Sequence, residues 1–295
     1  MALFAGLAAY PITPADADGV VDVSALRRLV RRLVDAGVDS IGLLGSTGTY
    51  AYLTRAERRR AIEAAVDEAA GRTPVMAGIG ALRTDAAVAL AKDAKAAGAG
   101  AGLLAPVSYT PLTDEEVFAH FHAVAGESGL PICVYNNPST THFTFGPALV
   151  QRLAATPGIV AVKNPAPAAA DVAAHLADLR ARLPTGFSLG YSVDGACAEA
   201  MIAGGDAWHS VLAGLCPGPL LDICRAARAG DAAQARRANA RLQPIWELFA
   251  RHGGLRVVYA AATLMGLSSA QPPRPILPLD PIETAKVGEA FKAVI

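Results

Sequence analysis

The stretch Ser40–Gly80, "SIGLLGSTGTYAYLTRAERRRAIEAAVDEAAGRTPVMAGIG", contains the unit that decides the fold. A short apolar run, "SIGLLGS", is followed by an alanine-rich stretch and then by a second apolar run, "PVMAGIG". Thr54 and Glu57 match the T-x-x-E capping box of a helix N-terminus, so we predict a helix over Thr54–Ala70. Strand, helix and strand in this order indicate a right-handed crossover between two parallel strands.

The same alternation of strand and helix repeats along the chain to about residue 215. Eight short apolar runs are predicted as strands: Leu3–Thr13, Ser40–Ser46, Pro74–Gly80, Ala101–Pro106, Pro131–Asn136, Ile159–Asn164, Phe187–Ser192 and Ala207–Ala213. The other helices predicted between them are Ser24–Ala36 (capped by Ser24), Thr84–Ala97, Thr113–Glu127 (with a second T-x-x-E box at Thr113 and Glu116), Pro147–Ala155, Ala168–Arg182 and Gly195–Ala203. This pattern fits a closed (β/α)8 TIM barrel. The alternative is an open doubly wound sheet, which would more often carry a glycine-rich phosphate loop where this chain has "AAYPITP".

No strand pattern recurs after Leu215. Further helices are predicted over Pro217–Ala229, Asp231–Arg251, Gly254–Met265 and Pro281–Ala293. We therefore expect two parts: a barrel over residues 1–215 that carries the active site, and a C-terminal helical extension over residues 216–295.

The composition argues against several classes of protein. Hydrophobic residues make up 53% of the 295 residues and charged residues 18%, so a large core is available. The 26 basic and 26 acidic residues balance, which argues against a nucleic-acid partner. No apolar run is long enough to span a membrane, and the N-terminus lacks a basic signal-peptide region, so we expect a soluble cytoplasmic protein. The four cysteines show no zinc-site spacing, so we expect buried free thiols and no metal.

Lys163 is an unusual residue to find at the end of a buried strand. It follows the apolar run "GIVAV", and in a barrel this end of a strand faces the active site. Burial disfavours the charged form of an amine, and a neutral amine can attack a ketone to form an imine, as in Schiff-base aldolases. The alternative is a lysine whose charged end extends to solvent, and position alone favours that alternative.

Two further features shift the balance towards imine chemistry. Tyr135 ends the neighbouring strand, so its phenol can relay protons near the amine of Lys163, although alone it would be interpreted as a core tyrosine. Ser46, Thr47 and Gly48 form a small loop after the second strand, whose hydroxyls and backbone N–H groups can bind a carboxylate. The alternative for this loop is a turn that simply needs small residues.

Four motifs occur in a fixed order: "GSTGT" after the second strand, "SYTP" after the fourth, "VYNNPST" on the fifth and "VAVKN" on the sixth. In this combination the chain resembles the dihydrodipicolinate synthase and N-acetylneuraminate lyase family of class I aldolases over essentially its whole length. The resemblance implies a lysine that forms an imine with pyruvate or another 2-oxo acid, which is joined to or cleaved from an aldehyde. It implies no cofactor beyond this covalent imine.

The resemblance also implies roles for individual residues. Lys163 would be the Schiff-base lysine and Tyr135 the proton-transfer tyrosine, and Thr47 would continue the proton relay. Ser46 and Thr47 would bind the carboxylate of the 2-oxo acid. Tyr109 matches a tyrosine that reaches into the relay of a neighbouring subunit, which implies a homo-oligomer, either a dimer or a tetramer.

The chain departs from the family pattern around the second substrate. Thr140 stands where dihydrodipicolinate synthases have an arginine that holds that substrate's carboxylate, and a neutral hydroxyl cannot form such an ion pair. Gly190 matches the synthases' motif on the seventh strand, and His209 falls at the pocket-lining position of the eighth. We therefore expect a second substrate without a carboxylate at this place, contacted by Thr140, Gly190, His209, His142 and Tyr191.

Three other functions remain as alternatives. A 2-keto-3-deoxy sugar-acid aldolase or dehydratase of the same family would use the same lysine. A non-catalytic barrel that binds a 2-oxo acid for regulation would explain the altered second-substrate positions, but it would not need Lys163, Tyr135 and Thr47 together. A phosphate-binding barrel enzyme would carry a glycine-rich loop after the last two strands, and "AWHSVLAGLCPG" matches this poorly.

Overall fold

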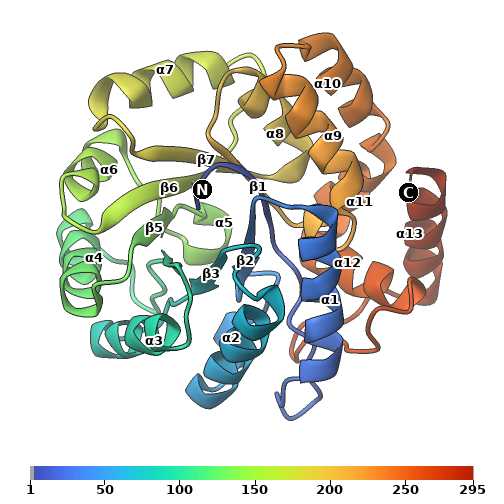
Figure 1. Ribbon diagram of the computed structural model, residues 1–295, viewed down its shortest axis with the longest axis horizontal. Helices are drawn as coiled ribbons and strands as arrows, with labels where there is room; N and C mark the ends of the chain where they lie inside the picture. The colour runs from blue at the N-terminus through green and yellow to red at the C-terminus, as the bar shows by residue number, and fades with distance from the viewer. Residues whose placement is uncertain (1–2, 295) are drawn as a thin grey trace.

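The computed structural model describes residues 3–294 and contains a closed barrel of eight parallel strands. Each strand pairs with the next along the chain, and the last pairs with the first. Figure 1 shows the strands at the centre with helices around them. The strands are β1 (Gly6–Ala9), β2 (Ser40–Leu43), β3 (Val75–Gly78), β4 (Ala101–Leu104), β5 (Ile132–Tyr135), β6 (Ile159–Pro165), β7 (Ser188–Ser192) and β8 (Ala207–Ser210). The (β/α)8 prediction is confirmed, and the open sheet is excluded.

The helices that cover and follow the barrel lie close to the predicted ranges. They are α1 (Val23–Ala36), α2 (Arg55–Ala69), α3 (Thr84–Ala96), α4 (Asp114–Ser128), α5 (Pro138–Thr141), α6 (Pro147–Ala154), α7 (Val172–Arg182), α8 (Asp194–Ile202), α9 (Pro217–Arg228), α10 (Ala232–Ala240), α11 (Gln243–His252), α12 (Gly254–Leu264) and α13 (Pro281–Val294), with short 3-10 helices η1 (Tyr50–Tyr52) and η2 (Leu212–Gly214). The single turn α5 was not predicted.

The N-terminal caps agree with the prediction at α4 and differ at α1. Thr113 and Glu116 form the complete capping box at the start of α4. At α1, however, the cap is Asp22, whose carboxylate accepts a hydrogen bond from the N–H of Ala25 at 2.9 Å. The predicted cap, Ser24, lies inside the first turn. Both residue types cap helices well, so the sequence alone does not decide between neighbouring candidates.

The capping box predicted for α2 forms only in part. The hydroxyl of Thr54 accepts from the N–H of Glu57 at 3.2 Å, as expected. The carboxylate of Glu57 instead accepts from the N–H of Val21 at 2.7 Å. This side chain therefore ties the segment before α1 to α2, a contact that local sequence cannot predict.

The helix predicted over 231–251 is wrong as a single element, because α10 ends at Ala240 and α11 begins at Gln243. Pro244 explains the break. A proline has no N–H to donate and its ring collides with the carbonyl of the preceding turn, whereas it fits the first turn of a new helix, where it lies in α11.

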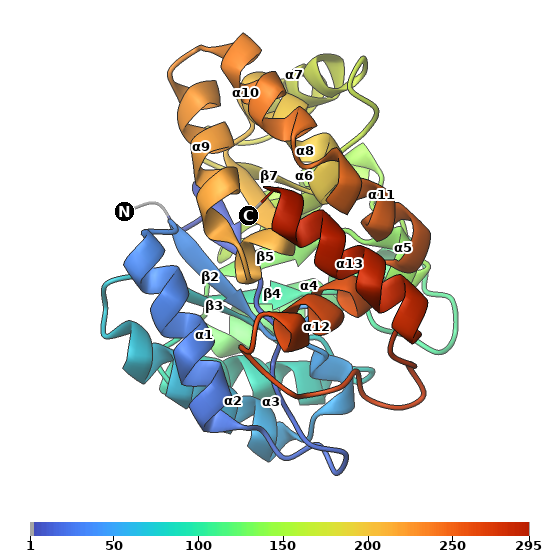
Figure 2. The same ribbon diagram turned by 90° about the vertical axis from the view of Figure 1, so that its right-hand side faces the viewer.

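Only helices follow the last strand among the described residues, as predicted. Helix α9 contacts β1, α1 and α8, so it completes the ring around the barrel. Helices α11, α12 and α13 contact one another on one side of the barrel (Figure 2). The division of the chain at residue 215 stays a prediction. Over residues 3–294, no helix combines the length and apolarity needed to cross a membrane.

Candidate active site

Lys163 and Tyr135 lie side by side on neighbouring strands, Tyr135 as the last residue of β5 and Lys163 near the end of β6, which continues to Pro165. The two residues are in register between β6 and β5, and both are buried, Lys163 to 4% and Tyr135 to 6% exposure. The Nζ atom of Lys163 lies 4.1 Å from the centre of the Tyr135 ring. The amine thus ends inside the barrel rather than in solvent, which removes the interpretation of Lys163 as a solvent-directed lysine.

A second aromatic ring, which was not predicted from the sequence, contacts the same amine. Tyr10 follows β1, and the centre of its ring also lies 4.1 Å from Nζ of Lys163. Tyr10 and Tyr135 belong to one cluster inside the barrel whose other members are mostly small or aliphatic. The two phenol rings therefore form much of the amine's surroundings. Tyr10 stands in the expected first strand, but its closeness to β6 arises only when the barrel closes.

The hydroxyl of Tyr135 joins Lys163's surroundings to the loop after β2. It lies 2.9 Å from Oγ of Ser46, and Nδ2 of Asn137 donates to it at 2.8 Å. Its hydrogen bonds among residues 3–294 do not include Thr47, the residue expected to continue the relay. Asn137 was also missed, although it is the second asparagine of "YNNPST", two residues beyond Tyr135.

The loop of Ser46, Thr47 and Gly48 is a tight turn at the mouth of the barrel. The N–H of Thr49 donates to the carbonyl of Ser46 at 3.1 Å, and a Cβ at Gly48 would lie 2.9 Å from the Cα of Leu44. Gly48 is therefore required by the turn itself. Thr47 is buried and Ser46 half-buried, and this turn places the hydroxyl of Ser46 beside the phenol of Tyr135.

Gly190 and His209 lie next to Lys163 inside the barrel. Gly190 is in register with Lys163, and a Cβ on it would overlap Nε2 of His209. Nδ1 of His209 lies 3.0 Å from the hydroxyl of Tyr10, and His209 is almost fully buried. Burial, with a smaller contribution from the charge of Lys163, lowers the pKa of His209 well below its usual value. Burial raises the pKa of Tyr10 well above its usual value.

Tyr191 does not face Lys163, and the expectation that it contacts the second substrate is wrong. Its hydroxyl lies 3.0 Å from Nδ1 of His175 on α7, outside the barrel. Successive side chains of a strand point to opposite faces. Because the position of Gly190 faces the interior, Tyr191 must face the helices.

Thr140, His142 and Tyr109 all lie in connections at the mouth side of their strands. Thr140 is exposed on α5, and its hydroxyl donates to the carbonyl of Asn137 at 3.3 Å. His142 is exposed at the end of α5. Tyr109 follows β4 and is 97% exposed in the single chain. None of these three makes a hydrogen bond to Lys163 or Tyr135 within residues 3–294.

Asp194 is a buried carboxylate at the start of α8, and its hydrogen bonds give it a structural role. It accepts hydrogen bonds from Nε1 of Trp208 and from the N–H of Leu212, each at 2.8 Å. Burial raises its pKa, and these hydrogen bonds oppose the increase. The carboxylate thus holds the start of α8 against β8 and η2.

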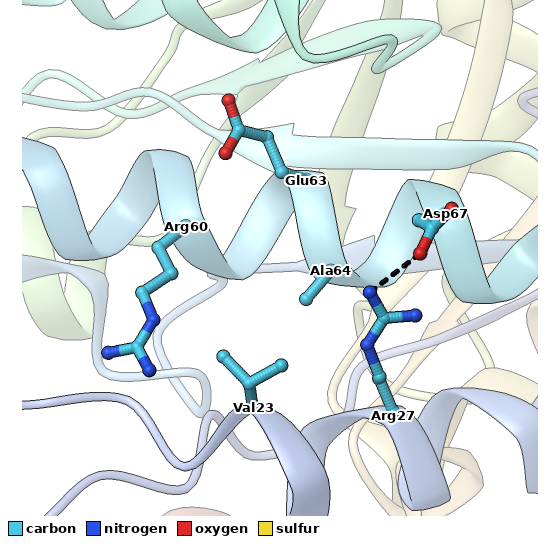
Figure 3. A pocket seen from close by; sticks show the side chains of 6 residues that line it. All are labelled: Val23, Arg27, Arg60, Glu63, Ala64 and Asp67. Atoms are coloured by element: carbon cyan, nitrogen blue, oxygen red, sulfur yellow. Dashed lines mark hydrogen bonds and ion pairs between the residues drawn. The ribbon is translucent and has the colours of Figure 1, made fainter.

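Two surface depressions lie apart from Lys163. One, of about 430 Å³, lies between α1 and α2, where Arg27 pairs with Asp67 at 2.6 Å (Figure 3). Another, of about 150 Å³, borders the segment before α1 and includes Thr49. The described residues contain no group of three or more His, Cys, Asp or Glu side chains that could hold a metal ion, and their four cysteines are free and buried.

Comparison with known proteins identifies the family. The model of the dihydrodipicolinate synthetase family matches residues 3–294. A 4-hydroxy-tetrahydrodipicolinate synthase from Methylococcus capsulatus is 40% identical over 249 residues, 84% of each chain. A dihydrodipicolinate synthase structure from Agrobacterium tumefaciens has a TM-score of 0.97 and 58% identity, covering 99% of this chain and 98% of its own. A chloride-inhibited dihydrodipicolinate synthase from Acinetobacter baumannii, complexed with pyruvate, has a TM-score of 0.90 and 28% identity over 99% of both chains. The chain belongs to the dihydrodipicolinate synthetase family of class I aldolase-type enzymes.

Proposed function

We propose that this enzyme binds pyruvate or another 2-oxo acid as an imine on Lys163 and joins it to, or cleaves it from, an aldehyde. The observation that carries the proposal is the buried amine of Lys163 against the ring of Tyr135, whose hydroxyl bonds to Ser46. The complex of the Acinetobacter baumannii relative with pyruvate supports pyruvate as the first 2-oxo acid to test.

In the proposed reaction, the amine of Lys163, once it has given up its extra proton, attacks the ketone carbon of the 2-oxo acid, and the ketone oxygen takes up protons and leaves as water. The resulting iminium draws electrons from the adjacent carbon, which loses a proton and becomes an enamine. The enamine carbon attacks the carbonyl carbon of the aldehyde, whose oxygen takes up a proton. Water then hydrolyses the new iminium and restores the amine. Because the iminium is the electron sink, this reaction needs no bound cofactor or metal.

Tyr135 is the proton carrier in this proposal. Its hydroxyl exchanges protons with the departing oxygen and with the aldehyde oxygen, and Ser46, 2.9 Å away, replaces the proton that it gives up. Ser46, Thr47 and Gly48 hold the carboxylate of the 2-oxo acid through hydroxyls and backbone N–H groups. Thr47 completes the relay once substrate is bound.

The second substrate lacks a carboxylate near Thr140. An exposed threonine hydroxyl cannot supply the paired, charged hydrogen bonds with which an arginine holds a carboxylate. A hydroxylated aldehyde, as released from a 2-keto-3-deoxy sugar acid, fits this position better. The sugar-acid aldolase or dehydratase is therefore the second candidate function, with the same lysine and the same 2-oxo acid half.

We also infer that a second copy of the chain covers Tyr109. A tyrosine exposed to 97% places a large apolar ring in water, and burying it in a subunit interface removes that cost. Analytical ultracentrifugation of the wild-type protein and of Tyr109→Ala tests this inference. The wild-type protein should sediment as a dimer or tetramer. The variant should already be dissociated at protein concentrations at which the wild type is still assembled. A monomeric wild type would refute the inference.

Borohydride trapping tests the imine. The protein is incubated with pyruvate, reduced with sodium borohydride and digested, and the modified peptide is found by mass spectrometry. The adduct should lie on Lys163, and the peptide with Lys95 serves as an internal control. The absence of any adduct with pyruvate would refute pyruvate as the substrate. The absence of an adduct with every member of a panel of 2-oxo acids would refute the mechanism.

Hydrogen exchange separates catalysis from mere binding. An enzyme of this kind should exchange the methyl hydrogens of pyruvate for deuterium in D2O, and Lys163→Ala should abolish the exchange. A wild-type protein that binds pyruvate without such exchange would instead be the non-catalytic barrel.

A further inference from the structure

Tyr10 and His209 form a buried, hydrogen-bonded pair beside the amine of Lys163. The hydroxyl of Tyr10 lies 3.0 Å from Nδ1 of His209, and both residues are at most 2% exposed. The centre of the Tyr10 ring lies 4.1 Å from Nζ of Lys163. The reaction described above assigns neither side chain a task, so the pair needs its own explanation.

Two glycines make room for this pair in the barrel wall. A Cβ at Gly42 on β2 would overlap the ring of Tyr10, and a Cβ at Gly190 on β7 would overlap Nε2 of His209. With a glycine behind each ring, Tyr10 and His209 fill space that ordinary strand side chains would occupy. The wall is thus shaped around the pair, which holds both rings in one place.

The pair is neutral. Burial and the charge of Lys163 lower the pKa of His209 well below its usual value, and burial raises the pKa of Tyr10 well above its own. Neither group can therefore serve as a counter-ion for a charged amine near pH 7. What Tyr10 offers the amine is the electron-rich face of its ring, which attracts cations.

We propose that the ring face of Tyr10 holds and stabilises the cationic iminium formed on Lys163, and that His209 is a positioning residue that fixes this ring through their hydrogen bond. The inference rests on the imine chemistry of the proposed function and deepens it. The carbinolamine that precedes dehydration can be neutral, whereas the iminium carries a positive charge. A ring face therefore stabilises the iminium over the carbinolamine and shifts the dehydration step towards the iminium.

The test uses variants that separate the ring from the hydrogen bond. Tyr10→Leu removes the ring, whereas Tyr10→Phe keeps it and removes the hydrogen bond. His209→Leu breaks the same bond from the other side, and His209→Asn keeps a polar group near the position of Nδ1. Tyr191→Phe is the matched control, because Tyr191 bonds to His175 at the same 3.0 Å on the outer side of the barrel. The readout is the pyruvate concentration that gives half-maximal borohydride trapping on Lys163, with kcat measured separately.

Removing the ring and removing the hydrogen bond should raise the pyruvate concentration needed for half-maximal trapping by different amounts. Tyr10→Leu should need about tenfold more pyruvate, the size expected for a desolvated cation and an aromatic ring. Tyr10→Phe and His209→Leu should each need about two- to threefold more, and the double variant no more than either alone, because both remove one bond. His209→Asn should recover much of the loss. Tyr191→Phe should leave the pyruvate concentration unchanged.

Three results would overturn the inference: a wild-type value for Tyr10→Leu, additive losses in the double variant, or a loss in Tyr191→Phe equal to that in Tyr10→Phe. Should Tyr10→Leu fail to fold by circular dichroism, Tyr10→Phe, which keeps the ring, and His209→Asn, which keeps a polar group near Nδ1, decide the question. A wild-type protein that traps no 2-oxo acid would refute the proposed function and this inference together. Normal trapping in both wild type and Tyr10→Leu would refute the inference alone.

Discussion

The hydroxyl of Tyr135 at the end of β5 lies 2.9 Å from the hydroxyl of Ser46 in the loop after β2. This bond joins two strand ends that are not neighbours in the barrel. Asn137 donates to the same phenol oxygen at 2.8 Å, so the proton of the phenol is free to point at Ser46 or at a substrate. This arrangement supports the proposal that Tyr135 carries protons to and from groups bound at Lys163.

We expect Tyr135→Phe to lower kcat by roughly 10²- to 10⁴-fold, the usual contribution of a general acid or base. The ring against Lys163 is kept, so borohydride should still trap pyruvate on the lysine, although more slowly. Steady-state kinetics and timed trapping measure the two effects. Tyr191→Phe, which removes a buried hydroxyl away from the site, should keep kcat near the wild-type value. A Tyr135→Phe enzyme within threefold of wild type would exclude Tyr135 as the proton carrier.

Thr140→Arg should improve the use of an aldehyde that carries a carboxylate. A charge-assisted pair is worth about 1.5–3 kcal/mol, which corresponds to roughly a 10- to 100-fold gain in kcat/KM for such a substrate. The pyruvate KM should not change, because the hydroxyl of Thr140 donates to the carbonyl of Asn137 and, within residues 3–294, Thr140 makes no direct hydrogen bond to Lys163 or to the Ser46 loop. Ser139→Arg is the control, since Ser139 is also exposed on the same short helix but is not at the family's arginine position. Equal gains in both variants would point to general charge attraction instead of a specific contact.

Most of the fold could be predicted from the chain because each strand and helix is marked locally. The regular alternation of apolar runs and capped helices leaves few topologies, and the closed barrel is the simplest for eight units. The misplaced boundaries have local causes. Pro244 divides a stretch whose pattern otherwise predicts one helix. At α1, Asp22 and Ser24 are both good capping residues, and the structure uses Asp22.

The site was harder to predict because it is assembled from distant strands. Tyr135 ends β5 and Lys163 lies near the end of β6, the next strand, so their contact follows from the order of the chain. Tyr10 was missed, because its contact with Lys163 depends on barrel closure between β1 and β8. Tyr191 was misassigned, although the two-residue period of a strand would have placed it outside once Gly190 was placed inside.

Gly190→Ala should destabilise the protein by about 1–3 kcal/mol, the usual cost of overpacking a core. The added Cβ would overlap Nε2 of His209, which cannot move away easily because it is buried and bonded to Tyr10. Urea unfolding measures the loss. Adding Gly190→Ala to a His209→Asn protein should lower the free energy of unfolding by less than it does in wild type, because the shorter asparagine side chain leaves the position that the new Cβ would overlap. Gly126→Ala is the control, because a Cβ there meets nothing within 4 Å and alanine favours a helix. Equal losses with and without His209→Asn would exclude the steric explanation.

His209 should make the protein less stable as the pH falls below about 6.5. In the unfolded chain the imidazole takes up a proton near this pH, whereas burial and the charge of Lys163 keep the pKa of His209 well below its usual value in the folded protein. The unfolded state then binds more protons, so stability falls with falling pH, by at most about 1.4 kcal/mol per pH unit for one group. His209→Asn cannot take up this proton. Urea unfolding at pH 7.5, 6.5, 5.5 and 5.0 should therefore show the stability advantage of wild type over His209→Asn shrinking only below about pH 6.5. A constant difference across this range would mean that His209 titrates alike in the folded and unfolded chains.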